Sequence, residues 1–177
     1  HGLYAIILLL TISKRKRKIP DITIQYWQLA ALSLIAFNLF YFLPDTYLHD
    51  SVITAKTTLF AALYIYFYLI AVIQGMLLKI LPFLSYTHLQ QRCLINFSAM
   101  QYLPHMHEFL NKKHGKYLFN MHVITGGVLF FTIIFPSFYW LLSLLLIIEF
   151  SWLFILMIKT FKLYQSITNK INLLVNE

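Results

Sequence analysis

The stretch VIQGMLLKILPFLSYTHLQ, residues 72–90, contains the point at which a long apolar segment gives way to polar sequence. Gly75 and Pro82 are predicted to interrupt the helix there, because proline removes a backbone donor and breaks a helix interior. A lysine, Lys79, and a histidine, His88, flank the proline. We therefore predict that a membrane-spanning helix ends at Pro82 and that a basic loop bearing histidines follows it.

The composition of the whole chain agrees with this prediction. Of the 177 residues, 60% are hydrophobic and only 11% are charged, and the mean hydropathy is +0.71. Soluble domains are about half apolar and a quarter charged, so the chain falls in the membrane class. The net charge of +8 fits basic loops on the cytoplasmic side of a membrane better than nucleic acid as a partner. The single cysteine, Cys93, excludes an internal disulfide framework.

Apolar segments bounded by prolines and charges predict an all-α fold, a polytopic bundle of transmembrane helices. The first segment is shorter than the roughly 20 residues that a spanning helix needs. It also lacks an initial Met and a basic leader. We therefore expect a fragment that begins within a helix. The expected spans are residues 1–13, 23–43, 57–81, 119–135 and 138–158, with a polar loop at 85–118 in a domain that ends at 162.

The lysines and arginines predict the orientation of these segments. The run 14–18 consists of five consecutive cations, and further cations fall in the 85–118 loop and at Lys159 and Lys162. The loop 44–56, by contrast, carries two acids and only Lys56. Because basic loops stay cytoplasmic, we predict that all of these cations except Lys56 face the cytoplasm.

The last residues, 163–177, repeat apolar side chains at helical spacing: Leu163, Ile167, Ile171 and Leu174. This pattern predicts an amphipathic C-terminal helix that lies on the inner membrane surface or on a partner. A simple continuation of the fifth span into water explains the pattern equally well.

Glu149 lies near the middle of the fifth predicted span, within LLIIEFSWLF. A charged side chain at the bilayer centre costs about 2.5–3.5 kcal/mol, so such residues are usually functional, paired or protonated. One interpretation is a proton-relay or cofactor-supporting carboxylate. The other is a protonated Glu149 that forms a hydrogen bond across a helix interface, to Ser143, Ser151 or Thr132.

Three further residues are candidates for cofactor binding. At about 1.5 Å per residue, His1 is expected roughly 18–20 Å from the basic run, inside the hydrocarbon core, where it could ligate haem or copper. Lys79 either extends to the inner headgroups or is placed for an anionic group, such as a haem propionate or an acidic lipid. His88 either contacts a cofactor or is an interfacial histidine.

A second group of histidines follows Pro104. His105, His107 and His114 lie near Glu108 and could bind zinc or copper, although their spacing matches no strong metal motif. Glu108 and Lys112 are also spaced as on an ordinary solvated helix face. His122 is expected near the cytoplasmic end of the fourth span. Gly126 and Gly127 in that span favour close helix packing.

The segment Gln74–Leu84, followed by His88 and Leu89, resembles a bacterial family of uncharacterised polytopic membrane proteins. That family is in turn similar to subunit I of haem–copper oxidases and to NnrS-type haem membrane proteins. The match covers about 20 residues, with Leu78 and Tyr86 standing where the family has Tyr and Trp. The resemblance implies a bacterial inner-membrane location and haem as a cofactor.

Three functional hypotheses follow. The chain could belong to a haem-binding, oxidase-like protein, with His1 as a ligand. It could be a proton-coupled permease, with Glu149 as the coupling residue and Gln74, Asn38 and Gln28 along a polar path. It could also be a structural or assembly subunit, with other membrane subunits as partners. Nothing in the sequence resembles a soluble-type catalytic motif.

Overall fold

A computed structural model of the chain describes residues 1–16, 21–42, 50–94 and 97–175. Every regular element among these residues is a helix, which confirms the predicted all-α fold. Four of the described helical segments are long and apolar enough to cross a membrane, and Gly2–Ser13 is a shorter apolar helix. Pro20 lies outside the described residues. So do residues 43–49, which include Pro44 and Asp45 of the predicted acidic loop.

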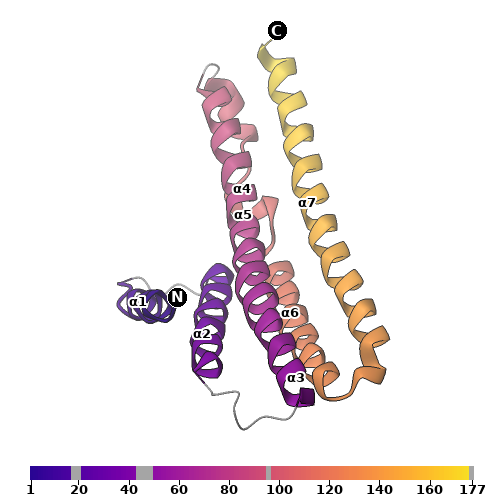
Figure 1. Ribbon diagram of the computed structural model, residues 1–177. Coiled ribbons are helices and arrows are strands. Elements are labelled where there is room, and N and C mark those ends of the chain that lie inside the picture. The colour runs from indigo at the N-terminus through magenta and orange to yellow at the C-terminus, as the bar shows by residue number, and fades with distance from the viewer. Residues whose placement is uncertain (17–20, 43–49, 95–96, 176–177) are drawn as a thin grey trace.

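The long helices follow one another in an antiparallel arrangement, and the short first helix lies at an angle to them (Figure 1). Helix α1 (Gly2–Ser13) packs on α2 (Ile22–Tyr41). Helix α3 (Asp50–Ala61), the π-helix η2 (Ala62–Ile70) and α4 (Ala71–Cys93) form one uninterrupted rod. The short helices η3 (Phe97–Tyr102) and α5 (Met106–Phe109) lead to α6 (Lys112–Ile134). The turn η4 (Pro136–Phe138) then leads to α7 (Tyr139–Val175).

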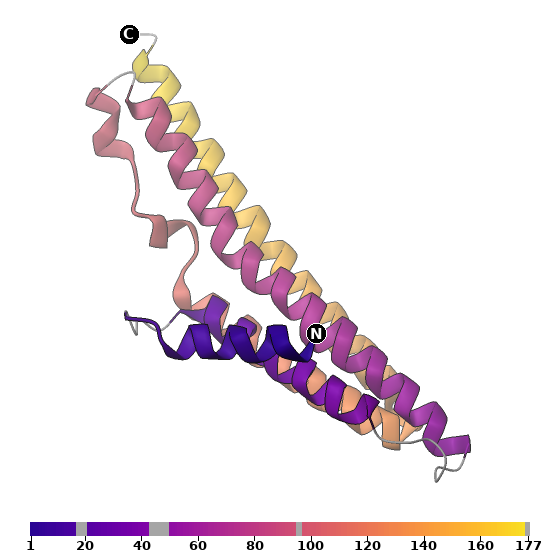
Figure 2. The same cartoon turned by 60° about the vertical axis from the view of Figure 1, so that its left-hand side comes forward.

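Two of the helical rods are about twice as long as a bilayer requires. Ala55–Cys93 has 39 residues and Pro136–Leu173 has 38, which at 1.5 Å per residue is close to 58 Å against a hydrocarbon thickness of about 30 Å. Both views show α4 and α7 running side by side past the ends of α2 and α6 (Figure 2). We call residues 80–93 and 160–175, with η3 and α5, the extension, and the rest of the bundle the spanning half.

Several contacts define one end of the spanning half, which we call the basic end. Lys79 pairs with Asp21 at 2.9 Å. A Cβ at Gly115 would touch Ile22 and Leu78. The hydroxyl of Thr160 donates to the carbonyl of Phe109 at 3.1 Å. Cations cluster in sequence around these positions: Lys112, Lys113, Lys116, Lys159 and Lys162.

The opposite end carries exposed aromatic side chains, as is common at membrane–water interfaces. Tyr139 is 70% exposed and Trp140 57% exposed, and both begin α7. Tyr139 and Lys159 stand ten residues before and after Glu149, so about 15 Å of helix separates Glu149 from either end. Glu149 therefore lies midway along the spanning half.

Three sequence predictions need correction here. The helix is interrupted neither at Gly75 nor at Pro82: α4 continues through both to Cys93. Apolar packing on both sides of the proline offsets the lost backbone bond, since Leu78 and Leu89 both lie in buried clusters. Much of the predicted loop 85–118 is accordingly helical, with α6 beginning at Lys112 rather than at 119.

The predicted amphipathic tail is the continuation of α7, the second of the two interpretations. Its apolar face packs within the protein rather than on a membrane surface. Ile167 and Ile171 are buried against Leu89, Cys93 and Phe109. The turn at Pro136 and Ser137 between the last two spans is confirmed as η4.

Candidate functional site

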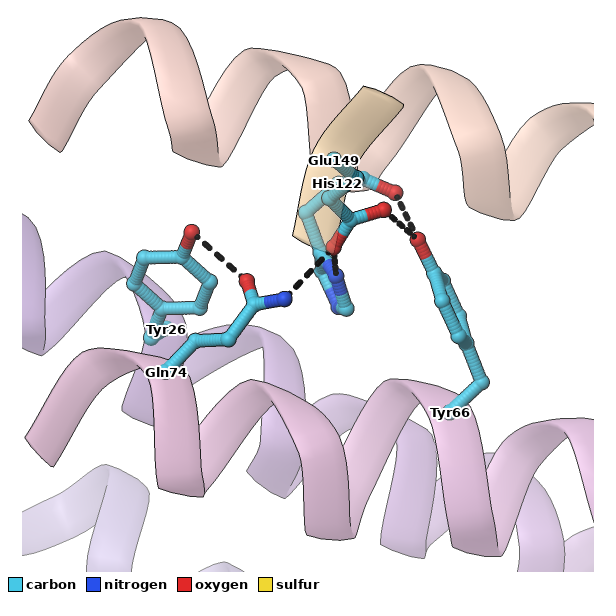
Figure 3. Close-up of polar contacts among 5 residues, drawn as sticks. All are labelled: Tyr26, Tyr66, Gln74, His122 and Glu149. Atoms are coloured by element: carbon cyan, nitrogen blue, oxygen red, sulfur yellow. Dashed lines mark hydrogen bonds and ion pairs between the residues drawn. The ribbon is translucent and has the colours of Figure 1, made fainter. Parts of the chain in front are cut away.

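A cluster of polar side chains fills the centre of the spanning half (Figure 3). Its members come from five different elements: Tyr26 from α2, Tyr66 from η2, Gln74 from α4, His122 from α6 and Glu149 from α7. Each of these residues is at most 3% exposed. We call these five residues the polar centre.

Glu149 is the hub of the polar centre, because three donors converge on its carboxyl group. The Gln74 amide donates to Oε1 at 2.6 Å, and His122 Nδ1 lies 2.8 Å from the same oxygen. The Tyr66 hydroxyl donates to Oε2 at 2.6 Å. Tyr26 donates to the carbonyl oxygen of Gln74 at 3.1 Å, which fixes the orientation of that amide. A carboxyl group that accepts from charged or polar donors on both oxygens is suited to hold negative charge.

His122 is held on two sides. Its ring stacks on Tyr66 at 4.4 Å between centroids and 17° between planes, and Nδ1 faces Glu149. The other ring nitrogen, Nε2, is buried and has no hydrogen-bond partner among the described residues. A buried polar atom without a partner is uncommon in proteins and marks a position that a proton, a water molecule or a ligand can use.

The chemistry of this pair depends on one shared proton. The proton can lie on Glu149 Oε1 or on His122 Nδ1 without movement of either side chain, because 2.8 Å is a normal hydrogen-bond distance. When Nε2 also carries a proton, the pair is neutral overall. When Nε2 is deprotonated and Glu149 is ionised, the pair carries one negative charge. Binding or release of a proton at Nε2 therefore changes the net charge of the polar centre.

Local sequence explains how these side chains meet. Gly75 on α4 allows α2 to approach closely, since a Cβ there would lie 2.8 Å from Cβ of Tyr26. A Cβ at Gly126 would overlap the ring of Phe67, which is next to Tyr66. Tyr66 and Phe67 belong to a π-helical stretch, a feature that often occurs at functional sites because it re-aims side chains.

Glu149 is buried and hydrogen-bonded, but with different partners from those the sequence suggested. Thr132 and Ser143 donate to carbonyls of their own helices, and Ser151 is exposed. Gln74, expected along a polar path, lies in the polar centre, whereas Asn38 bonds to Leu34 of its own helix.

His122 is the main residue that sequence reasoning misplaced. It lies fully buried in the third turn of α6 rather than near an interface, because α6 begins seven residues earlier than predicted. The Asn111 side chain accepts from the amide of Lys113, and this helix cap could have located the start of α6. The pairing of His122 with Glu149 has no signal in a single sequence.

The three candidate cofactor residues lie in different places. His1 is exposed at the start of α1 and makes an edge contact with Tyr64. Lys79 pairs with Asp21 and lines one groove, while His88 hydrogen-bonds to Tyr164 at 2.6 Å and lines another. This arrangement does not fit a single haem pocket built from these residues. Haem binding stays a prediction.

The structure describes the side chains of two of the three histidines that were predicted as metal ligands. His105 is exposed, and its backbone amide donates to Glu108, which caps α5. His114 packs beside Trp152. The side chain of His107 lies outside the described residues. Among the side chains that the structure describes, no three His, Cys, Asp or Glu residues gather as a metal site.

The fold and the polar centre together define a class of protein: a helical integral membrane protein with a buried acid–histidine pair. No protein-family model matches the chain, and neither a curated protein nor a solved structure matches it. The polar centre is therefore the basis for any functional assignment.

Proposed function

We propose that this chain belongs to a membrane transport protein that translocates protons, in which Glu149 and His122 bind and release the transported proton. The observation that carries the proposal is the fully buried Glu149 carboxyl group, midway along the spanning half, with donors from three other elements. Ionisable residues at such depth are rare and mark ion pathways and proton relays.

The geometry suggests a division of roles. Glu149 Oε1 and His122 Nδ1 share a proton, and Nε2 of His122 exchanges protons with the rest of a pathway. Gln74 and Tyr66 donate to Glu149 in either state and lower the cost of its negative charge. Tyr66 also lies 3.1 Å from the carbonyl of His122, so its single proton has a second acceptor nearby. The centre can thus change charge without rearrangement of its heavy atoms.

The same proposal includes the orientation of the chain. We infer that the basic end faces the cytoplasm of a bacterial inner membrane, because lysines accumulate there. The extension then lies in the cytoplasm. Labelling of a cysteine introduced at an exposed position of the extension, with a membrane-impermeant reagent on intact cells and on inverted vesicles, tests this orientation. If the reagent labelled this cysteine in intact cells but not in inverted vesicles, the proposed orientation would be contradicted.

Proton movement tests the function directly. The full-length protein is reconstituted into vesicles that contain a pH-sensitive dye, and a potassium diffusion potential drives proton entry. We expect wild-type protein to conduct protons and Glu149→Gln to reduce entry to the rate of empty vesicles. His122→Gln retains a donor for Oε1 but cannot accept a proton at Nε2, so we expect the same loss.

The matched control is Ser143→Ala on the same helix, whose hydroxyl bonds only within α7. We expect it to conduct like the wild type. Equal proton entry with wild-type and Glu149→Gln protein, both above empty vesicles and with normal thermal stability, would contradict the proposal.

A further inference from the structure

A groove of about 310 Å³ opens on the surface of the spanning half at its basic end. It lies between α1, α2 and α4, and its lining combines two cations with apolar and aromatic side chains. The lining includes Arg15, Thr23, Trp27, Met76, Lys79 and Ile80.

The two cations line the same groove, near the basic end where the proposed orientation places the lipid headgroups. Lys79 is at the basic end, and Arg15 directly follows the last turn of α1. The Lys79 side chain is 55% exposed and gives one of its three donors to Asp21, so two donors are left for another anion.

Asp21 does not cancel the positive charge of the groove. Burial raises the pKa of the Asp21 carboxyl, but the hydrogen bonds from Lys79 and from the Thr23 amide outweigh it and hold the pKa below its ordinary value of 3.8. Asp21 is therefore ionised at neutral pH. Of the two cations that line the groove, Asp21 balances one, and Arg15 is left to pair with one phosphodiester.

The rest of the lining suits an acyl chain. Met76 is 40% exposed and Ile80 44% exposed on the outer face of α4, and Trp27 lies on the facing side of α2. A tryptophan at the headgroup level is typical of lipid-facing helices. Basic pockets between helices on the cytoplasmic side are known to bind anionic lipid headgroups.

We propose that this groove binds one anionic phospholipid, with its phosphodiester on Arg15 and Lys79 and an acyl chain along Met76 and Ile80. A free phosphate could use the cations, but it would leave the apolar part of the lining unused. The proposal is independent of proton transfer at Glu149, because it involves none of the residues of the polar centre.

Quenching of tryptophan fluorescence tests the proposal. Full-length protein in mild-detergent micelles is titrated with brominated phosphatidylglycerol or with brominated phosphatidylcholine. The signal from the groove is the difference between wild-type protein and Trp27→Phe. We expect phosphatidylglycerol to quench this signal at lower concentrations than phosphatidylcholine.

Charge variants identify the headgroup contacts. Each cation near a membrane surface contributes enough to change affinity about fivefold, so we expect Arg15→Gln to weaken phosphatidylglycerol binding by about that factor. Lys116→Gln is the matched control, because Lys116 is exposed near the basic end and does not line the groove. It should leave binding unchanged.

Three results would overturn the proposal. Equal quenching by the two lipids would show that charge is not recognised. An equal effect of Arg15→Gln and Lys116→Gln would show a diffuse surface attraction without a site. Displacement of brominated phosphatidylglycerol by inorganic phosphate at constant ionic strength would show that the cations bind a free anion and that the acyl chain contributes nothing.

Discussion

Both the spanning half and the extension bury apolar clusters, but among the described residues only the spanning half also buries a cluster of polar and charged side chains. In the spanning half, Glu149, His122 and Gln74 are buried at the centre, while many large apolar residues are exposed on the outside. In the extension, the buried cluster contains Leu89, Cys93, Phe109, Ile167 and Ile171.

In the proposed orientation the extension lies in water, where burial of apolar area stabilises a fold by about 25 cal/mol per Å². In lipid this driving force is absent, and polar contacts and close packing hold helices together. The same two helices, α4 and α7, contribute to both regions. The polar centre is therefore expected to contribute to the stability of the spanning half, as the apolar cluster does to that of the extension.

The largest expected effect is the loss of Glu149. Glu149→Ala leaves donors from Tyr66, Gln74 and His122 without their acceptor, and removal of one partner from a buried charged pair typically costs about 3–5 kcal/mol. The free energy of unfolding in mixed micelles measures this cost. A change as small as that of Ser143→Ala would contradict the arrangement of the polar centre.

Leu89→Ala tests the other region. Leu89 is fully buried in the extension, and a Leu-to-Ala change in such a core costs about 2–5 kcal/mol. We expect faster proteolysis within residues 80–93 and 160–175, with unchanged proton entry into vesicles. Loss of proton entry without loss of folding would show that the two regions are not independent in function.

Two adjacent glycines provide a matched test of close packing. Gly126→Ala would drive a methyl group into the ring of Phe67, which is itself stacked on Phe130, and such overpacking costs about 1–3 kcal/mol. Gly127→Ala meets nothing within 4 Å, so we expect no loss of stability. Thermal unfolding of the two variants compares them, and equal stability would contradict the close approach of η2 to α6.

The smallest expected effect is at the basic end. The pKa of Asp21 lies below 3.8, so the stability from its contact with Lys79 is present at neutral pH and is lost as pH falls through that lowered pKa. Since both side chains are partly exposed, Asp21→Asn should cost less than about 1 kcal/mol. The variant should also remove the corresponding acid-dependent loss of thermal stability. If Asp21→Asn still lost thermal stability in acid to the same extent, the loss would come from another titratable group.

The sequence located the four long apolar helices, although not all of their ends, because hydropathy is a local property. It drew attention to Glu149 because a charge in an apolar helix is conspicuous. It misjudged Pro82, because the packing of α4 on α7 that sustains the helix is a tertiary effect. It placed His122 too near an interface, because the polar first turns of α6 hide the start of that helix from hydropathy.

Tyr66 could not be assigned to the site from sequence. Its position depends on the π-helical stretch Ala62–Ile70, which changes the helix face that each side chain occupies. No local sequence pattern predicts that stretch. The convergence of donors from three other elements on the Glu149 carboxyl group is likewise a property of the folded bundle alone.

The most direct test of the proposed role is infrared spectroscopy of the protein in lipid vesicles as pH is varied. If Glu149 and His122 bind and release a proton, a carboxyl C=O band and imidazole bands change together over one pH range. The carboxyl change is then absent from Glu149→Gln, and the imidazole change is absent from His122→Gln. Spectra of wild-type and Glu149→Gln protein that respond identically to pH would contradict a protonation role for Glu149.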